Sequence, residues 1–367
     1  EWAIQNIHPG TVGALLTAGA KVTDVPDVNT FSIGYPYFML VRGDRSINTQ
    51  MNAPTPTNTT LRASGQLHLC DFSYPFQLAE DAGQFNLVGN PYQSPVDMSL
   101  VLADATNVNP VSYQVFDPTI NDNGAYVVVD VSNGSTVPVS SANEYLQPGQ
   151  SAFVYTANNG SASLTFSENH KYTLNTNDAI FRPANSSNTS IRIQLYKNQN
   201  KLIDGSKINL GDNFTFDNDY RDIIKSTNFD ETFGIYNNND VYAIVSEPSP
   251  ETSRTYPLDI INYRETDYRF ELELENTQGL EVYLKDNYLD QTIDASEFNF
   301  YDFSIDMNDA SSNPDRFELF VTNQSLSDDK ITTSKFIIYP NPITDNSFEI
   351  SSSEFSGHQV EVSIHSI

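Results

Sequence analysis

Short apolar and polar segments alternate along the whole chain. Runs rich in β-branched and aromatic residues, at 126–131, 151–155, 191–196 and 269–274, are separated by segments rich in Gly, Pro, Asn, Asp and Ser. Within 270–275 apolar and acidic residues alternate one by one, which is the period of a strand with one buried and one solvent-facing side. The pattern predicts many short strands and few helices.

Turn dipeptides separate these runs. The four that carry the strongest turn chemistry are Asn123-Gly124, Asn133-Gly134, Asn159-Gly160 and Asp204-Gly205. Asn, Asp and above all Gly adopt positive φ angles at low cost, so each dipeptide predicts a tight connection between strands. Segments 11–20 and 217–225 have weak helical patterning and are expected to be short connectors.

The fold class expected from this pattern is all-β, with tandem β-sandwich or jelly-roll-like domains. The chain has 367 residues, which is more than one compact domain usually contains. Predicted ranges are a β-rich domain at 1–170, a second β-sandwich at 171–325, a polar linker at 326–334 and an incomplete domain at 335–367.

Charge narrows the range of partners. The chain holds 47 Asp and Glu against 19 Lys and Arg, a formal net charge of -28, and such a field repels nucleic acid and anionic lipid. The longest apolar runs are far shorter than the ~20 residues of a membrane-spanning helix. Cys70 is the one cysteine, so no disulfide forms within this sequence. We expect the chain to be a mature product or a piece of a longer one.

The last segment begins with KFIIYPNP. Pro340 and Pro342 fix φ and have no N–H to donate, so a strand at 336–339 is expected to end after Tyr339. The segment continues with FEI at 348–350 and VEVSI at 360–364.

This segment resembles the type A C-terminal sorting domain of the type IX secretion system of Bacteroidota, an Ig-like β-sandwich. The resemblance rests on Tyr339, Pro340, Asn341, Pro342, Phe348 and Ile350. It implies a sorting signal that an outer-membrane shuttle protein and the secretion translocon recognise, and a secreted or cell-surface location. Residues 335–367 would then be the start of that domain.

Other segments resemble parts of large secreted Bacteroidota proteins. The similar segments are 37–46, 85–97, 146–154, 214–225, 283–286 and 315–319. The first contains Arg42, Gly43, Asp44 and Arg45. Because Gly43 can adopt the positive φ that ends a strand, we interpret these four residues as a structural turn and not as an adhesion ligand.

Candidate catalytic chemistry is sparse. The five histidines are scattered, and no G-x-S-x-G elbow or glycine-rich phosphate loop occurs. His68 and Cys70 would share one face of a strand, and a half-buried strand position explains them better than a metal site. We therefore predict that the chain is not an enzyme and needs no cofactor.

A structural calcium ion is a second hypothesis, because calcium binds oxygen ligands in loops. Two oxygen-rich clusters could supply them: Asp286, Asn287, Asp290 and Asp294, and Asp306, Asn308, Asp309 and Asp315.

The leading functional hypothesis is the non-catalytic C-terminal part of a secreted protein, with its β-sandwich domains serving as stalk or adhesion modules. The alternative is a carbohydrate-binding or accessory region of a secreted glycan- or protein-degrading enzyme. Trp2 is the one tryptophan, so an aromatic platform for surface glycans would consist of tyrosines.

Overall fold

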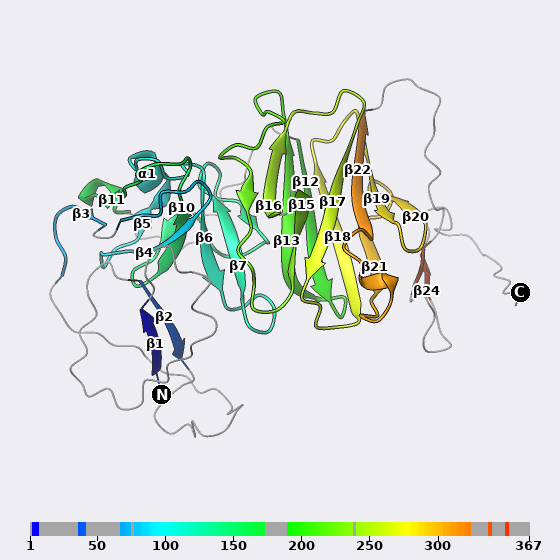
Figure 1. Cartoon of the computed structure of the whole chain (residues 1–367), viewed down its shortest axis with the longest axis horizontal. Coiled ribbons are helices and arrows are strands. Elements are labelled where there is room, and N and C mark those ends of the chain that lie inside the picture. Colours follow the sequence, from blue (N-terminus) through cyan, green and yellow to red (C-terminus); the bar gives the residue numbers. More distant parts are fainter. Residues whose placement is uncertain are drawn as a thin grey trace, which may run out of the picture. The chain divides into compact units, whose positions relative to one another are not determined.

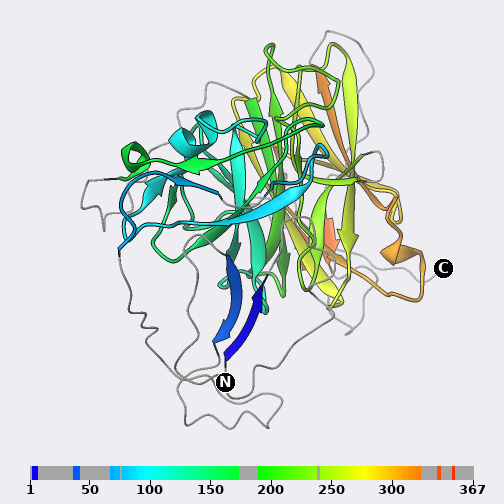
Figure 2. The same cartoon turned by 60° about the vertical axis from the view of Figure 1, so that its left-hand side comes forward.

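The computed structural model describes residues 2–6, 36–41, 67–74, 77–172, 189–237, 240–323, 337–339 and 349–351 (Figures 1 and 2). Strands dominate these residues, which include one α-helix and two 3-10 helices. The predicted all-β fold class is confirmed. Two compact units are present, the first with Glu1–Val115, Val129–Ser135 and Ala142–Ala184, the second with Phe116–Val128, Thr136–Ser141 and Asn185–Ile367. The predicted domain ranges stay predictions.

One sheet of five strands has the order β4-β10-β6-β7-β8. Elements up to residue 172 are β1 (Trp2–Asn6), β2 (Tyr37–Val41), β3 (Phe72–Ser73), β4 (Phe85–Gly89), β5 (Val96–Asp97), α1 (Met98–Ala103), β6 (Ser112–Asp117), β7 (Ala125–Asp130), β8 (Thr136–Val137), β9 (Tyr145–Leu146), β10 (Ser151–Tyr155), β11 (Thr165–Phe166) and η2 (Glu168–His170). Strands β7 and β10 confirm the strands predicted at 126–131 and 151–155.

A hydrophobic cluster forms the core of the first unit and includes Val88 of β4, Val154 of β10 and Met98 of α1. Helix α1 begins where the Asp97 carboxylate accepts a hydrogen bond from the backbone N of Ser99 at 2.9 Å. This cap satisfies a backbone donor that the first helical turn leaves unpaired. The helix was not predicted, because its six residues are too few to show a helical period.

Three of the four predicted turn dipeptides are confirmed. Gly124, Gly134 and Gly160 have φ angles of 83°, 70° and 127°. At Gly124 a Cβ atom would collide with the ring of Phe116. Only glycine therefore fits the connection between β6 and β7 without a rearrangement.

The second unit contains most of the remaining strands. They are β12 (Thr189–Lys197), β13 (Lys201–Leu210), β14 (Ile223–Ile224), β15 (Thr232–Asn237), β16 (Asp240–Glu247), β17 (Ser253–Ile261), β18 (Asp267–Glu275), β19 (Leu280–Asp286), β20 (Gln291–Asp294), β21 (Phe300–Ser304) and β22 (Phe317–Asn323), with the 3-10 helix η3 (Ala310–Ser312). They form one sheet with the order β20-β19-β22-β17-β15-β16-β13-β12-β18-β21, and β14 pairs with β16.

This sheet curls so that strands distant in its order pack face to face. Five strands lie between β22 and β18 in the hydrogen-bonded order. Nevertheless, the ring of Phe317 on β22 lies 5.0 Å from that of Phe270 on β18 and 4.6 Å from that of Phe303 on β21. The three rings belong to one buried cluster, which is the core of a sandwich made from a single sheet.

The strands predicted at 191–196 and 269–274 are confirmed by β12 and β18, which pair antiparallel. Along β18 the side chains of Phe270 and Leu272 are buried, whereas Glu273 is exposed. The acidic residues of this strand therefore form its solvent-facing side, as the alternation indicates.

The turn predicted at Asp204-Gly205 is wrong. Both residues lie inside β13, where Gly205 is opposite Gln194 and the Asp204 side chain is fully buried. The turn instead lies at Asn198 and Gln199, whose φ angles are 50° and 64°. Tertiary contacts of the buried aspartate override the local preference of an Asp-Gly pair for turns. Segment 217–225 is not helical, as expected of a connector, and its residues 223–224 form β14. Segment 11–20 lies outside the described residues.

Candidate functional site

The predicted sorting signal coincides with a pair of short strands. Strand β23 (Ile337–Tyr339) pairs antiparallel with β24 (Glu349–Ser351), which places Tyr339 opposite Glu349 and Ile338 opposite Ile350. The segment joining these strands lies outside the described residues and contains Pro340, Asn341, Pro342 and Phe348. A strand that ends at Tyr339 agrees with the sequence, and the role of these residues in sorting stays a prediction.

The predicted turn at Arg42, Gly43, Asp44 and Arg45 follows β2 directly. Strand β2 pairs antiparallel with β1, and Val41 lies opposite Trp2. The four turn residues lie outside the described residues, so their conformation stays a prediction.

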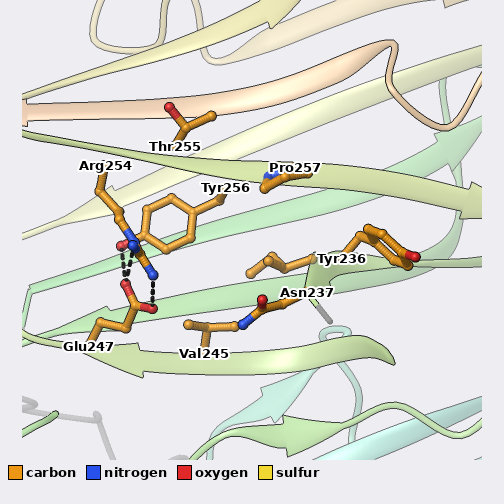
Figure 3. Close-up of a pocket in the computed structure, with 9 residues that line it drawn as sticks. Tyr236, Asn237, Val245, Glu247, Arg254, Thr255, Tyr256 and Pro257 are labelled. Carbon is orange, nitrogen blue, oxygen red and sulfur yellow. Dashed lines mark hydrogen bonds and ion pairs between the residues drawn. The ribbon is translucent and has the colours of Figure 1, made fainter. Parts of the chain in front are cut away.

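A cavity of about 330 Å³ lies in the second unit (Figure 3). It opens where the ladder between β15 and β17 ends, because the last pair in that ladder is Ile235 with Leu258. Beyond this pair β15 continues along β16 up to Asn237 and no longer along β17. The residues that line the cavity are Ile235, Tyr236, Asn237, Val245, Glu247, Arg254, Thr255, Tyr256 and Pro257.

A rigid polar group forms one end of this cavity. The Arg254 guanidinium donates from Nε to Glu247 Oε2 at 2.9 Å and from Nη2 to Glu247 Oε1 at 2.7 Å, and the Tyr256 hydroxyl donates to Glu247 Oε2 at 3.2 Å. Hydrogen bonding to Glu247 raises the pKa of Arg254, and burial raises the pKa of Tyr256. Arg254 is therefore a fixed cation and Tyr256 a neutral hydroxyl at physiological pH.

Polar groups also remain available at the cavity. The side chains of Asn237 and Thr255 form no hydrogen bond with any residue that the structure describes. The ring of Phe216 lies 5.5 Å from the Arg254 guanidinium. Since the carboxylate of Glu247 is already engaged by Arg254, the arrangement suits binding of a small polar molecule better than acid–base catalysis.

His170 has a structural role that the sequence did not reveal. Its Nδ1 accepts from the backbone N of Ser167 at 3.1 Å, and its Nε2 lies 2.9 Å from Asp104 Oδ2. Acceptance at Nδ1 places the proton of a neutral imidazole on Nε2, which then donates to Asp104. Nδ1 thus caps the start of η2 as part of a capping box with Ser167, and Nε2 connects the buried ring to Asp104, the C-cap residue of α1.

The strand predicted around His68 and Cys70 is wrong. Residues 67–70 lie before β3, and Cys70 is exposed with a φ of 82° in a bend. The backbone N of Cys70 donates to Glu168 Oε1 at 2.7 Å, and His68 packs edge-on against Phe72. Among the described residues, no group of three or more His, Cys, Asp or Glu side chains is arranged to hold a metal ion.

The two oxygen-rich clusters considered for calcium serve other contacts. Asp286 is buried and accepts hydrogen bonds from Arg316 and from the hydroxyl of Tyr301. Asp306 accepts from the backbone N of Asn308, and Asp309 caps η3. These carboxylates close turns or bind a guanidinium in the structure.

Comparisons with protein-family models, with curated proteins and with solved structures found no match. The strands and their pairing define the described part of the chain as all-β with curled sheets. In the part of the chain that the structure describes, no helix is both long and apolar enough to cross a membrane.

Proposed function

We propose that this chain is the non-catalytic C-terminal part of a secreted or cell-surface protein that the type IX secretion system exports. Its terminal segment is the sorting signal, read by the outer-membrane shuttle protein and the translocon. The β-sandwich units upstream serve as a stalk or as adhesion modules. The net charge of -28 favours a solvated surface over contact with nucleic acid or anionic lipid.

The observation that carries this proposal is the arrangement around Pro340-Asn341-Pro342. The preceding strand ends at Tyr339, and its partner β24 begins at Glu349. Two prolines separated by one residue withhold two backbone donors directly after a strand, so they prevent the ladder from continuing. A short strand pair offers strand edges for recognition by strand addition. The sequence predicts that the two prolines hold Asn341 extended beside it.

Substitution of both prolines tests the signal. Pro340→Ala together with Pro342→Ala, in the full-length protein expressed in a Bacteroidota host, should lower the surface and medium fractions to background and leave the protein in the periplasm. The matched control replaces Pro248 and Pro250, which have the same Pro-X-Pro spacing outside the signal, and should be exported normally. Normal export of the Pro340 and Pro342 variant would refute the assignment.

The cavity favours a second candidate function, the binding of a neutral carbohydrate. Sugar hydroxyls pair with amide, hydroxyl and guanidinium groups, and Asn237, Thr255 and Arg254 offer these at one cavity. Its volume of about 330 Å³ lies at the lower end of the range for small-ligand pockets. The negative net charge disfavours acidic glycans.

Calorimetric titration of the full chain with soluble neutral oligosaccharides tests this second candidate. Asn237→Ala should weaken any binding that is found, whereas Asn299→Ala, an exposed asparagine outside the cavity, should not. Equal affinity of both variants would place the binding elsewhere, and no heat with glucans, mannans and chitooligosaccharides would remove the candidate.

A further inference from the structure

A lysine and an aspartate are buried together in the second unit. The side chains of Lys225 and Asp204 are 1% and 0% exposed, and Lys225 Nζ lies 2.6 Å from Asp204 Oδ1. Asp204 is in the middle of β13, and Lys225 directly follows β14. Burial of two such ions carries a large desolvation cost, and their attraction offsets it only where every proton and lone pair is hydrogen-bonded.

The lysine ammonium does not meet that condition. It has three protons, and in the described part of the chain it donates to two acceptors, Asp204 Oδ1 and the carbonyl oxygen of Gly205. Burial lowers the pKa of Lys225 and raises the pKa of Asp204, so both groups shift toward their neutral forms. A neutral amine beside a neutral carboxylic acid is the pair of reactants for an amide.

The carboxyl group of Asp204 is held as an acyl group would be. Its Oδ2 accepts from the backbone N of Phe233 at 2.8 Å and from Asn228 Nδ2 at 3.0 Å. Two fixed donors on one oxygen are the arrangement that stabilises the negative charge of a tetrahedral intermediate. The other oxygen, Oδ1, faces the lysine nitrogen.

We propose that Lys225 and Asp204 condense to an intramolecular amide that links β13 to the segment after β14. The ammonium first transfers a proton to the carboxylate. The lone pair of Nζ then forms a bond to Cγ of Asp204, and the bond between Cγ and Oδ1 breaks. Oδ1 leaves as water with the transferred proton and one proton from Nζ. The net charge of the pair is zero before and after the reaction, and no oxidant or other reactant is needed.

The surrounding groups meet the hydrogen-bonding needs of the amide product better than they meet those of the ion pair. An amide has one N–H, and the carbonyl of Gly205 already accepts from that nitrogen. The amide oxygen keeps both donors that now bind Oδ2, from Phe233 and Asn228. The backbone N of Gly205 alone loses its acceptor, Oδ1. Condensation also removes two buried charges, so the site is shaped for a neutral group.

Such a bond would give this sequence the covalent cross-link that one cysteine cannot provide. It would close a loop of about 20 residues and so restrict the unfolded chain, as a disulfide of equal span does. The amide lies inside the second unit, so its formation does not depend on the route of export.

Intact mass under denaturing conditions tests the proposal on the full wild-type chain. The expected mass is lower than that of the sequence by one water molecule. A tryptic digest should then contain a branched product, in which residues 202–207 are joined to residues 222–254 because Lys225 is no longer a cleavage site. Lys225→Arg, which keeps the positive charge and cannot form this bond, should have the full mass of its sequence.

The wild-type measurement alone decides the question if a variant does not fold. A wild-type mass equal to that of the sequence, with residues 222–225 released as a free tryptic peptide, would overturn the proposal. A loss of water located at any other pair of residues would overturn it as well.

Discussion

Arg316 offers a sharp test of how burial changes the strength of an ion pair. Its guanidinium binds Asp286 through Nε at 3.0 Å and Nη2 at 2.8 Å, while Nη1 donates to the carbonyl oxygens of Ser304 and Ser311. Both charged side chains are almost fully buried, at 1% and 0% exposure. Arg316→Met keeps much of the apolar volume and removes the cation.

The loss of stability expected for Arg316→Met follows from the Asp286 charge that the substitution leaves buried. Removal of one partner from a buried pair costs about 3–5 kcal/mol, because the other charge stays buried without compensation. The cation also lies 4.6 Å from the ring of Phe317, a contact that contributes about 1 kcal/mol. We therefore expect Arg316→Met to lower the free energy of unfolding by about 4 kcal/mol. Adding Asp286→Asn, which removes the uncompensated charge, should recover part of this loss.

Urea unfolding followed by far-UV circular dichroism measures both variants against a matched control. Arg221 binds Asp219 with a similar two-pronged geometry, but its side chain is 23% exposed. Arg221→Met should therefore cost about 1 kcal/mol or less. The reasoning is refuted if the Arg316 and Arg221 variants lose the same stability, or if Asp286→Asn makes the Arg316 variant still less stable.

Two further predictions concern the second unit. Hydrogen bonds from Lys197 and Lys201 lower the pKa of Asp122 to about 2, so its contribution to stability is present above about pH 4 and is lost as the pH falls through 2. Asp122→Asn should accordingly destabilise by up to ~1 kcal/mol at pH 6 and have a much smaller effect at pH 2, as chemical unfolding at both pH values would show; an equal effect at both would contradict the assignment. Gly124→Ala should cost about 2 kcal/mol in thermal unfolding, since φ is 83° and the new methyl group collides with Phe116; an unchanged melting temperature would contradict it.

The part of the fold that could be predicted from sequence is the part with a local cause. Buried and solvent-facing residues alternate along β18, and this alternation is visible in consecutive residues of the sequence. The turn at Gly124 was predictable because glycine adopts a positive φ at low cost. Asp204 could not be interpreted in this way, because its buried position depends on Lys225, which is 21 residues away. The local preference of an Asp-Gly pair for turns is the same wherever the pair occurs. The contact with Lys225 therefore determines that this pair lies in a strand.

The candidate sites likewise differ in whether their cause is local in the sequence or depends on distant residues. The ordered motif at Tyr339 to Pro342 is visible in the sequence because proline acts on its own backbone. The cavity at Glu247 and Arg254 was missed, because it exists only where two strands separate after Ile235. His170 was visible as a residue, but its capping role depends on Ser167 and Asp104.

Export in a host that lacks the type IX translocon tests the central claim most directly. The full-length protein should appear on the surface or in the medium of the parent strain and should accumulate in the periplasm of the translocon-deficient strain. Detection at equal levels outside both strains would contradict the proposal that the segment with Tyr339 and Ile350 is a sorting signal of that system.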